Sequence, residues 1–396
     1  MEQEKKEEKV HHKDVFHKKS PKVLSLGNLF IGLIILLGIL VIINVFLTFN
    51  LNKETQKSVE AVKEKLKPAK VELVVLKNSR CIDCFDISTI ISHVKNSNVN
   101  VTKLSTLEFD SKEGKAIIGR YKITKIPTIV VTGEIDNLNI QGLEKNGNAL
   151  LLSKIAPPFT NALSGRIEGR VAVYYLKDPS CEKCSNLTTL INQIKSAGVK
   201  ISEIKDIAPN SDDGKDLIAK YNLGFAPAII LSRDAYVYDI IAQAWPRIGS
   251  KESDGSYVLR LVNPPFINLT TGKLMGMASI IYLADKSCST CYDVKLHRQI
   301  LANPQTFAMV LEKEEAYDVQ DSKGKELIAK YNITQVPTAI LSDEVGIYPS
   351  AQVLRQFYSL EKDGSYIFRK LSVVGTYKDL TTNQVVQAQQ QANQQQ

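Results

Sequence analysis

One sequence pattern occurs three times in tandem along this chain, and any fold must accommodate all three copies. All six cysteines lie in CxxC pairs, namely Cys81–Cys84, Cys181–Cys184 and Cys288–Cys291. An apolar run precedes each pair, and an x-Pro step follows at a nearly constant distance, at Pro127, Pro227 and Pro337. Chance does not maintain such spacing. We therefore infer three copies of one unit of about a hundred residues, which is a typical domain size.

Within each copy the hydrophobic pattern alternates between strands and helices. The run "VAVYYL" (171–176) is apolar on both faces, which suits a central strand covered on both sides. In "SNLTTLINQIK" (185–195) the apolar residues recur at i, i+3, i+4 and i+7, as in an amphipathic helix. A strand, a helix and a strand that opens at Pro227 complete the unit. This order predicts an α/β domain with a right-handed parallel crossover.

One segment before the repeats has the composition of a transmembrane helix. No charged residue occurs between positions 23 and 52, and "LFIGLIILLGILVIINVFLTF" (29–49) is long enough to cross the hydrocarbon core, which needs about 20 apolar residues. A buried soluble helix is disfavoured by this length and uniformity. A cleaved signal peptide is disfavoured by the long preceding tail and the lack of a small-residue cleavage site. The basic cluster "HKKSPK" (17–22) favours a cytoplasmic N-terminus. We therefore expect a single-pass protein of the cell membrane, with residues 50–396 extracytoplasmic.

The repeats and their flanks divide the chain into seven segments. In chain order these are a polar N-terminal tail, a transmembrane signal anchor, a helical stalk, three repeat domains and a Gln-rich disordered tail, at residues 1–24, 25–50, 51–69, 70–160, 161–267, 268–380 and 381–396. The last expectation rests on "QVVQAQQQANQQQ" (384–396), which is almost free of charge and too polar to form a core.

A strand that ends in CxxC and is followed by an aliphatic-Pro-Thr step resembles the thioredoxin-like superfamily. The segments "GRYKITKIPT", "AKYNLGFAPA" and "AKYNITQVPT" are similar to the sequence around that family's cis proline. The resemblance implies three tandem thioredoxin-like domains, each an α/β unit with a central mixed sheet flanked by helices. It also implies that Pro127, Pro227 and Pro337 are cis, lie beside the cysteine pairs and offer backbone to a substrate strand.

The chemistry implied by this resemblance is thiol–disulfide exchange. Cys81, Cys181 and Cys288 would attack as thiolates, and Cys84, Cys184 and Cys291 would resolve the mixed disulfides. We expect the first cysteine of each pair at the N-terminal end of a helix, where free N–H groups and the helix dipole favour the anion. No cofactor is required, and the expected partners are protein thiols or disulfides and a lipid bilayer.

The chain departs from the family at two places. The dipeptides between the cysteines are Ile-Asp, Glu-Lys and Ser-Thr, which match none of the family's reductases, oxidants or isomerases. Six residues before the first cysteine, where thioredoxins have a buried acid, stand Val75, Tyr175 and Tyr282. The sequence therefore predicts the class of chemistry but no direction of electron flow.

Three other interpretations compete with redox chemistry. A zinc ribbon needs two CxxC pairs about 15–20 residues apart, whereas these pairs lie about a hundred apart, so no metal site is predicted. For the same reason we expect His93 and His297 to be surface or packing residues rather than ligands. A net charge of +8 without aromatic residues among the basic clusters gives no support to nucleic-acid binding.

The strongest alternative is a non-catalytic scaffold that binds peptides or proteins and uses its CxxC disulfides structurally, as small exported domains often do. A CxxC bridge closes a very short loop and removes little entropy from the unfolded chain, which favours chemistry over a structural role. The sequence therefore predicts a membrane-anchored thiol–disulfide oxidoreductase that acts on exported proteins or relays electrons through three sites.

Overall fold

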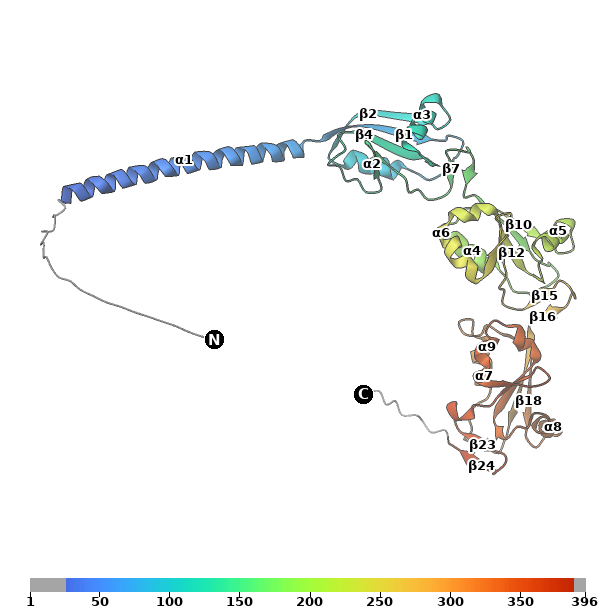
Figure 1. Cartoon of the computed structure of the whole chain (residues 1–396). Coiled ribbons are helices and arrows are strands. Elements are labelled where there is room, and N and C mark those ends of the chain that lie inside the picture. The colour runs from blue at the N-terminus through green and yellow to red at the C-terminus, as the bar shows by residue number, and fades with distance from the viewer. Residues whose placement is uncertain (1–25, 388–396) are drawn as a thin grey trace, which may run out of the picture. The chain divides into compact units, whose positions relative to one another are not determined.

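The computed structural model describes residues 26–387 and begins with one long helix, α1 (Leu26–Leu66) (Figure 1). Its part Ile31–Glu60 is long and apolar enough to cross a membrane, as both a membrane anchor and a signal sequence would be. The predicted apolar helix is thus confirmed, and it continues without a break through most of the predicted stalk (51–69). The polar tail predicted at 1–24 lies outside the described residues.

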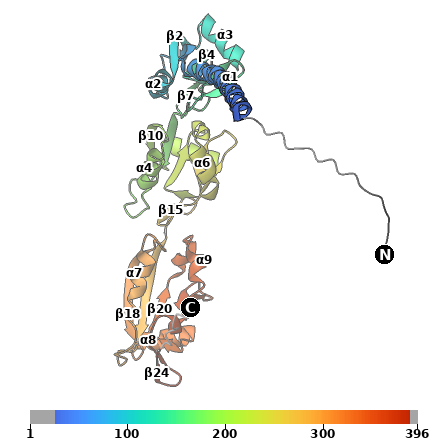
Figure 2. The same cartoon turned by 90° about the vertical axis from the view of Figure 1, so that its left-hand side faces the viewer.

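Three similar sets of elements follow, and Figures 1 and 2 label several elements of each set. The first set comprises β1 (Ala69–Lys77), α2 (Ser88–Asn96), β2 (Val99–Glu108), α3 (Lys112–Tyr121), β3 (Lys125–Ile126), β4 (Thr128–Gly133), β5 (Glu144–Asn146), β6 (Ala149–Leu151), β7 (Phe159–Asn161) and β8 (Ile167–Glu168). The second comprises β9 (Val171–Leu176), α4 (Thr188–Ser196), β10 (Ile201–Ile207), α5 (Asp212–Tyr221), β11 (Phe225–Ala226), β12 (Ala228–Leu231), η1 (Arg233–Val237), α6 (Asp239–Ala244), η2 (Trp245–Arg247), β13 (Gly249–Lys251), β14 (Tyr257–Leu259), β15 (Phe266–Asn268) and β16 (Leu274–Met275). The third comprises β17 (Met277–Ala284), α7 (Leu296–Ala302), β18 (Val310–Asp318), α8 (Ser322–Tyr331), β19 (Gln335–Val336), β20 (Thr338–Leu341), η3 (Asp343–Ile347), α9 (Ala351–Leu354), β21 (Tyr358–Leu360), β22 (Tyr366–Phe368), η4 (Leu371–Val373), β23 (Tyr377–Asp379) and β24 (Gln384–Val386).

Each set builds a five-stranded mixed sheet with the same strand order. The orders are β2-β1-β4-β6-β5, β10-β9-β12-β14-β13 and β18-β17-β20-β22-β21. β9 and β10 are parallel, as are β17 and β18, whereas β12 and β20 run antiparallel to these central strands. A parallel pair joined through a helix, followed by an antiparallel hairpin, is the arrangement of a thioredoxin-like domain. The predicted α/β fold class is confirmed.

The central strands are buried because both of their faces are apolar. In the second domain Val173 and Tyr175 pack with Ile191 of α4 on one face of the sheet. On the other face Leu176 packs with Tyr221 of α5. The two amphipathic helices therefore cover opposite faces, and the end of the central strand is left at the edge where the CxxC pair begins.

A small three-stranded sheet completes each domain. Its orders are β3-β7-β8, β11-β15-β16 and β19-β23-β24, so each small sheet consists of a hairpin and the two residues that precede the x-Pro proline. These hairpins cross the domain boundaries that we expected after residues 160, 267 and 380. We expected the segment 381–396 to be disordered, but its first part forms β24, in which Val385 pairs with Lys378. Residues 388–396 lie outside the described part.

Candidate functional site

Each CxxC pair forms a disulfide just beyond the end of the central strand. The bridges are Cys81–Cys84, Cys181–Cys184 and Cys288–Cys291, with Cα–Cα distances of 5.4, 5.4 and 5.5 Å. The first cysteine donates its backbone N–H to the carbonyl three residues earlier, at Asn78, Asp178 and Asp285. Each pair therefore lies in a tight turn that leaves the sheet.

The expectation that the first cysteine begins a helix is wrong. α2, α4 and α7 start only at Ser88, Thr188 and Leu296. The residue after the second cysteine donates its backbone N–H to the segment just before the hairpin, so this N–H is not available for a helical hydrogen bond. The bonds run from Phe85 to Pro158 O at 3.0 Å, from Ser185 to Pro265 O at 2.8 Å and from Tyr292 to Thr376 O at 2.9 Å. The sulfur atoms consequently lack the helix N-terminus that would stabilise a thiolate.

The resemblance implied that the x-Pro peptide bonds are cis and that the prolines lie beside the disulfides. The peptide bonds before Pro127, Pro227 and Pro337 are cis, and all three prolines are buried. In the second domain Pro227 lines one surface pocket of about 400 Å³ together with Cys181 and Cys184. The structure therefore brings these three predicted site residues to one place.

The backbone before each cis proline is already paired with the chain's own hairpin. Ile126 is opposite Thr160, Ala226 is opposite Ile267, and Val336 is opposite Lys378, all in antiparallel register. A substrate strand that used this edge would meet an edge already hydrogen bonded. The substrate-binding role of the three prolines stays a prediction.

The hairpin residue opposite the x-Pro step meets the CxxC turn differently in each domain. In the first domain Asn78 donates a hydrogen bond to buried Thr160 at 2.9 Å. In the third domain Lys378 donates to Asp285 at 2.6 Å, and together with Ser287 it holds the pKa of the Asp285 carboxyl below its usual range. The second domain has Ile267 at this place, which offers no polar side chain.

A cation from outside the repeat pattern reaches the first disulfide. Arg170, two residues after β8, donates to the Asp83 carboxylate at 3.2 Å through Nε and lies 3.9 Å from Cys81 Sγ through Nη2. Its hydrogen bond holds the pKa of Asp83 below the usual value. The adjacent Arg80 instead pairs with Asp110 at 2.8 Å. Sequence proximity gave no signal for Arg170, because it lies 89 residues from Cys81.

The third domain contains a buried histidine that the sequence did not single out as functional. His297 of α7 is 6% exposed and packs edge-on against Phe368. Its Nδ1 is hydrogen bonded with the Tyr358 hydroxyl, and its Nε2 lies 3.2 Å from the Tyr292 hydroxyl. Burial lowers the pKa of His297 to about 4. His297 is therefore a packing residue, as predicted, and it is neutral at pH 7.

This burial predicts a pH-dependent stability of the third domain. Between pH of about 6.5 and 4 the unfolded chain binds a proton at His297 that the folded domain does not, so stability falls as pH falls, by up to about 3 kcal/mol. We expect His297→Gln to flatten this slope. The measurement is hydrogen exchange of third-domain peptides at several pH values. His93→Gln, at an exposed position of α2, is the control; an unchanged slope in His297→Gln would contradict the assignment.

Within residues 26–387 no group of three or more His, Cys, Asp and Glu side chains is arranged to hold a metal ion. The candidate sites are the three CxxC disulfides.

Each domain is thioredoxin-like in strand order, in its CxxC disulfide and in its cis proline. No family model matches the chain, and no curated protein matches it. Among solved structures the chain is similar to ERdj5 in crystal form II, with 13% identity, coverage of 72% of this chain and 39% of that chain, and a TM-score of 0.14. It is also similar to the zinc-bound form of human ERp44, with 12% identity, coverage of 75% and 90%, and a TM-score of 0.14.

A third similar structure is the C503A mutant of the alkylhydroperoxide reductase AhpF from Enterococcus faecalis, with 18% identity, coverage of 44% of this chain and 81% of that chain, and a TM-score of 0.14. The chain thus spans 39% of the length of ERdj5. With TM-scores of this size, the fold assignment rests on the strand order and connections of each domain.

Proposed function

We propose that this chain is a thiol–disulfide exchange protein that acts on exported proteins or relays electrons between thiol partners. The observation that carries the proposal is the pocket of the second domain, where Cys181, Cys184 and Pro227 border one space of about 400 Å³ that is open to solvent. A disulfide sulfur that an outside thiolate can reach is the minimum requirement for exchange.

The exchange transfers two electrons in two nucleophilic steps. A partner thiolate attacks Cys181 Sγ, forming a mixed disulfide while the Cys181–Cys184 bond breaks and Cys184 leaves as a thiolate that takes up a proton. A second partner thiolate then attacks the partner's sulfur in the mixed disulfide and releases Cys181 as a thiolate. The partner gains a disulfide, and two electrons pass to the cysteine pair. The reverse sequence oxidises this pair's thiols at the expense of a partner disulfide.

The proposal includes the membrane as the place of action. The part Ile31–Glu60 of α1 has the length and composition of a span, and the basic cluster at 17–22 favours a cytoplasmic N-terminus. Residues after α1 are then extracytoplasmic, where disulfides persist because the compartment is oxidising. A retained anchor would hold all three domains near the membrane that exported proteins cross.

A second candidate is a peptide- or protein-binding scaffold whose disulfides are structural. It is favoured by the hairpins, which occupy the backbone edge before each cis proline, and by the position of the CxxC turns ahead of their helices. Under this alternative no pair cycles between disulfide and dithiol.

A redox titration separates the two candidates. The folded chain is equilibrated in glutathione buffers of stepped potential, free thiols are alkylated, and each pair is read by peptide mass spectrometry. We expect the Cys181–Cys184 pair to convert reversibly at a potential above about −300 mV, the limit below which structural disulfides typically lie. If all three pairs stay oxidised until the domains unfold, the scaffold is the correct function.

A further inference from the structure

The three disulfides differ in the side chains and pockets that surround them. We propose that Cys181–Cys184 is the open exchange site of this protein, and that the side chain after the second cysteine closes the other two. This inference rests on the proposed function and deepens it by assigning the exchange to one pair. The residues concerned are Phe85, Ser185 and Tyr292, which occupy equivalent positions in the three repeats.

Ser185 leaves the second disulfide uncovered. Its backbone N–H and its hydroxyl both donate to the hairpin segment, to Pro265 O at 2.8 Å and to Asn263 O at 2.6 Å. A small side chain held in this way does not extend over the sulfur atoms. The pocket of about 400 Å³ at this place therefore has Cys181 and Cys184 in its wall.

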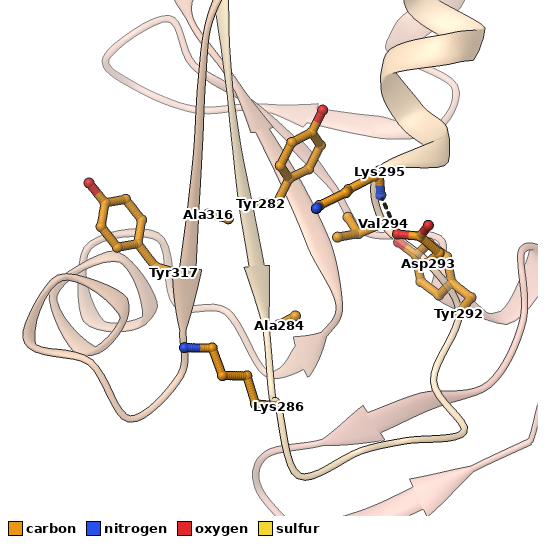
Figure 3. A pocket seen from close by; sticks show the side chains of 9 residues that line it. All are labelled: Tyr282, Ala284, Lys286, Tyr292, Asp293, Val294, Lys295, Ala316 and Tyr317. Carbon is orange, nitrogen blue, oxygen red and sulfur yellow. Dashed lines mark hydrogen bonds between the residues drawn. The ribbon is translucent and has the colours of Figure 1, made fainter.

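Tyr292 lines the equivalent pocket in the third domain. Its hydroxyl donates to the carbonyl of Pro337 at 3.0 Å, so the side chain spans from the CxxC turn to the cis proline. The corresponding pocket, of about 220 Å³, is lined by Tyr282, the counterpart of the Tyr175 that lines the second-domain pocket, and by Tyr292 itself. The residues that line it include neither Cys288 nor Cys291, and Figure 3 shows Tyr292 among them.

The hairpins add a second, independent difference. In the first and third domains a polar side chain of the hairpin bonds to the CxxC turn, through Asn78–Thr160 and Asp285–Lys378. In the second domain Ile267 makes no such bond, and a further pocket of about 520 Å³ lies between its hairpin and the turn. Cys181 borders this pocket as well.

In the first domain the polar hairpin residue lies beside a sulfur atom of the pair. Phe85 follows Cys84, and Thr160, which is fully buried, lies with its hydroxyl 3.9 Å from Cys84 Sγ. Cys81 is only 8% exposed. Because disulfide exchange requires access of the attacking thiolate to a sulfur atom, reaction at this pair is expected to be slow.

The test exchanges the two side chains in the full-length protein. Folded wild type, Ser185→Tyr and Tyr292→Ser are treated with dithiothreitol, quenched by alkylation at successive times, and read pair by pair with peptide mass spectrometry. We expect the second pair of the wild type to be reduced about tenfold faster than the others, a barrier difference of about 1.4 kcal/mol. Ser185→Tyr should slow the second pair, and Tyr292→Ser should speed the third pair, by similar factors.

Two controls keep the result interpretable. Tyr292→Phe retains the ring, so the third pair should still be reduced slowly. Hydrogen exchange of β17 and β20 shows whether Tyr292→Ser remains folded. Ser185→Tyr tests the same idea in another domain. Equal rates at all three pairs, or no change on either exchange, would overturn the inference. Dithiothreitol needs no natural partner, so this result stands apart from the redox titration: a pair can be open and still have a structural potential.

Discussion

Lys378→Met is expected to destabilise the third domain by about 3 kcal/mol, because it leaves the Asp285 carboxylate buried without its counter-charge. The two side chains are 14% and 6% exposed, and Nζ lies 2.6 Å from Oδ2. The remaining donors to Asp285 are the backbone N–H and the hydroxyl of Ser287, at 2.8 and 2.6 Å. Both donate to Oδ1, so Oδ2 loses its partner in the variant.

The loss can be separated from a general effect of removing a lysine. Lys330→Met breaks an ion pair with Asp363 whose side chains are 51% and 37% exposed, and exposed pairs contribute little. Adding Asp285→Asn to Lys378→Met removes the unpaired charge and should recover much of the stability. The measurement is hydrogen exchange of β17 and β23 in each variant. Equal losses in Lys378→Met and Lys330→Met would show that the Asp285 pair contributes no more than a surface pair.

The Lys378–Asp285 ion pair also makes the stability of the third domain depend on pH. Lys378 holds the pKa of Asp285 below its usual range, so the stabilising contribution is present above the unfolded carboxyl pKa and is lost as pH falls through the folded value. The difference between wild type and Lys378→Met should therefore shrink in acid. A difference that stays constant from neutral pH into the acid range would contradict this account.

The sequence was sufficient to predict the repeat, the α/β class and the place of each cysteine pair at the end of a central strand. Each of these features leaves a strong local signal. "VAVYYL" has the length and apolar content of a buried central strand, and the helix after each CxxC pair has clear periodicity. These signals need no knowledge of distant contacts.

The hairpins could not be predicted from the sequence, because strands of two or three residues are too short to show a hydrophobic period. A signal was nonetheless present in the turns. Asn268 accepts hydrogen bonds from the N–H groups of Thr270 and Thr271, and Gly272 then adopts a φ of 68°. Asn161 and Asp379 begin the same kind of turn. An Asx turn repeated after each domain, and followed by Gly or Asn, would have indicated these hairpins.

A repeated glycine in the helix before each x-Pro step also lacked a visible reason in the sequence. A Cβ at Gly114 would lie 2.2 Å from Glu108 O, and one at Gly214 would lie 2.1 Å from Ala208 O. The strand end folds back over the first turn of the helix, and only glycine admits that approach. A Cβ at Gly119, in the same helix as Gly114, would have nothing within 4 Å, so spacing in sequence does not distinguish the two.

The charges around the cysteines also could not be predicted from neighbouring residues in the sequence. Arg80 is next to Cys81 in sequence, yet it pairs with Asp110, whereas the cation near Cys81 Sγ is Arg170. Sequence neighbours of a cysteine therefore do not define its electrostatic surroundings, because hairpins and connectors bring distant residues to the turn.

Covalent capture of partners shows whether the second pair exchanges disulfides with other proteins. Cys184→Ser removes the resolving thiol, so a mixed disulfide formed when Cys181 attacks a partner disulfide is no longer resolved from within the pair and accumulates. The full-length variant is expressed in its membrane, thiols are blocked with an alkylating reagent, and adducts are resolved on non-reducing gels and identified by mass spectrometry. Cys181→Ser, which lacks the attacking thiol, is the matched control. We expect adducts with exported proteins in Cys184→Ser that disappear on reduction and are absent from Cys181→Ser. Equal absence of adducts from both variants would contradict it.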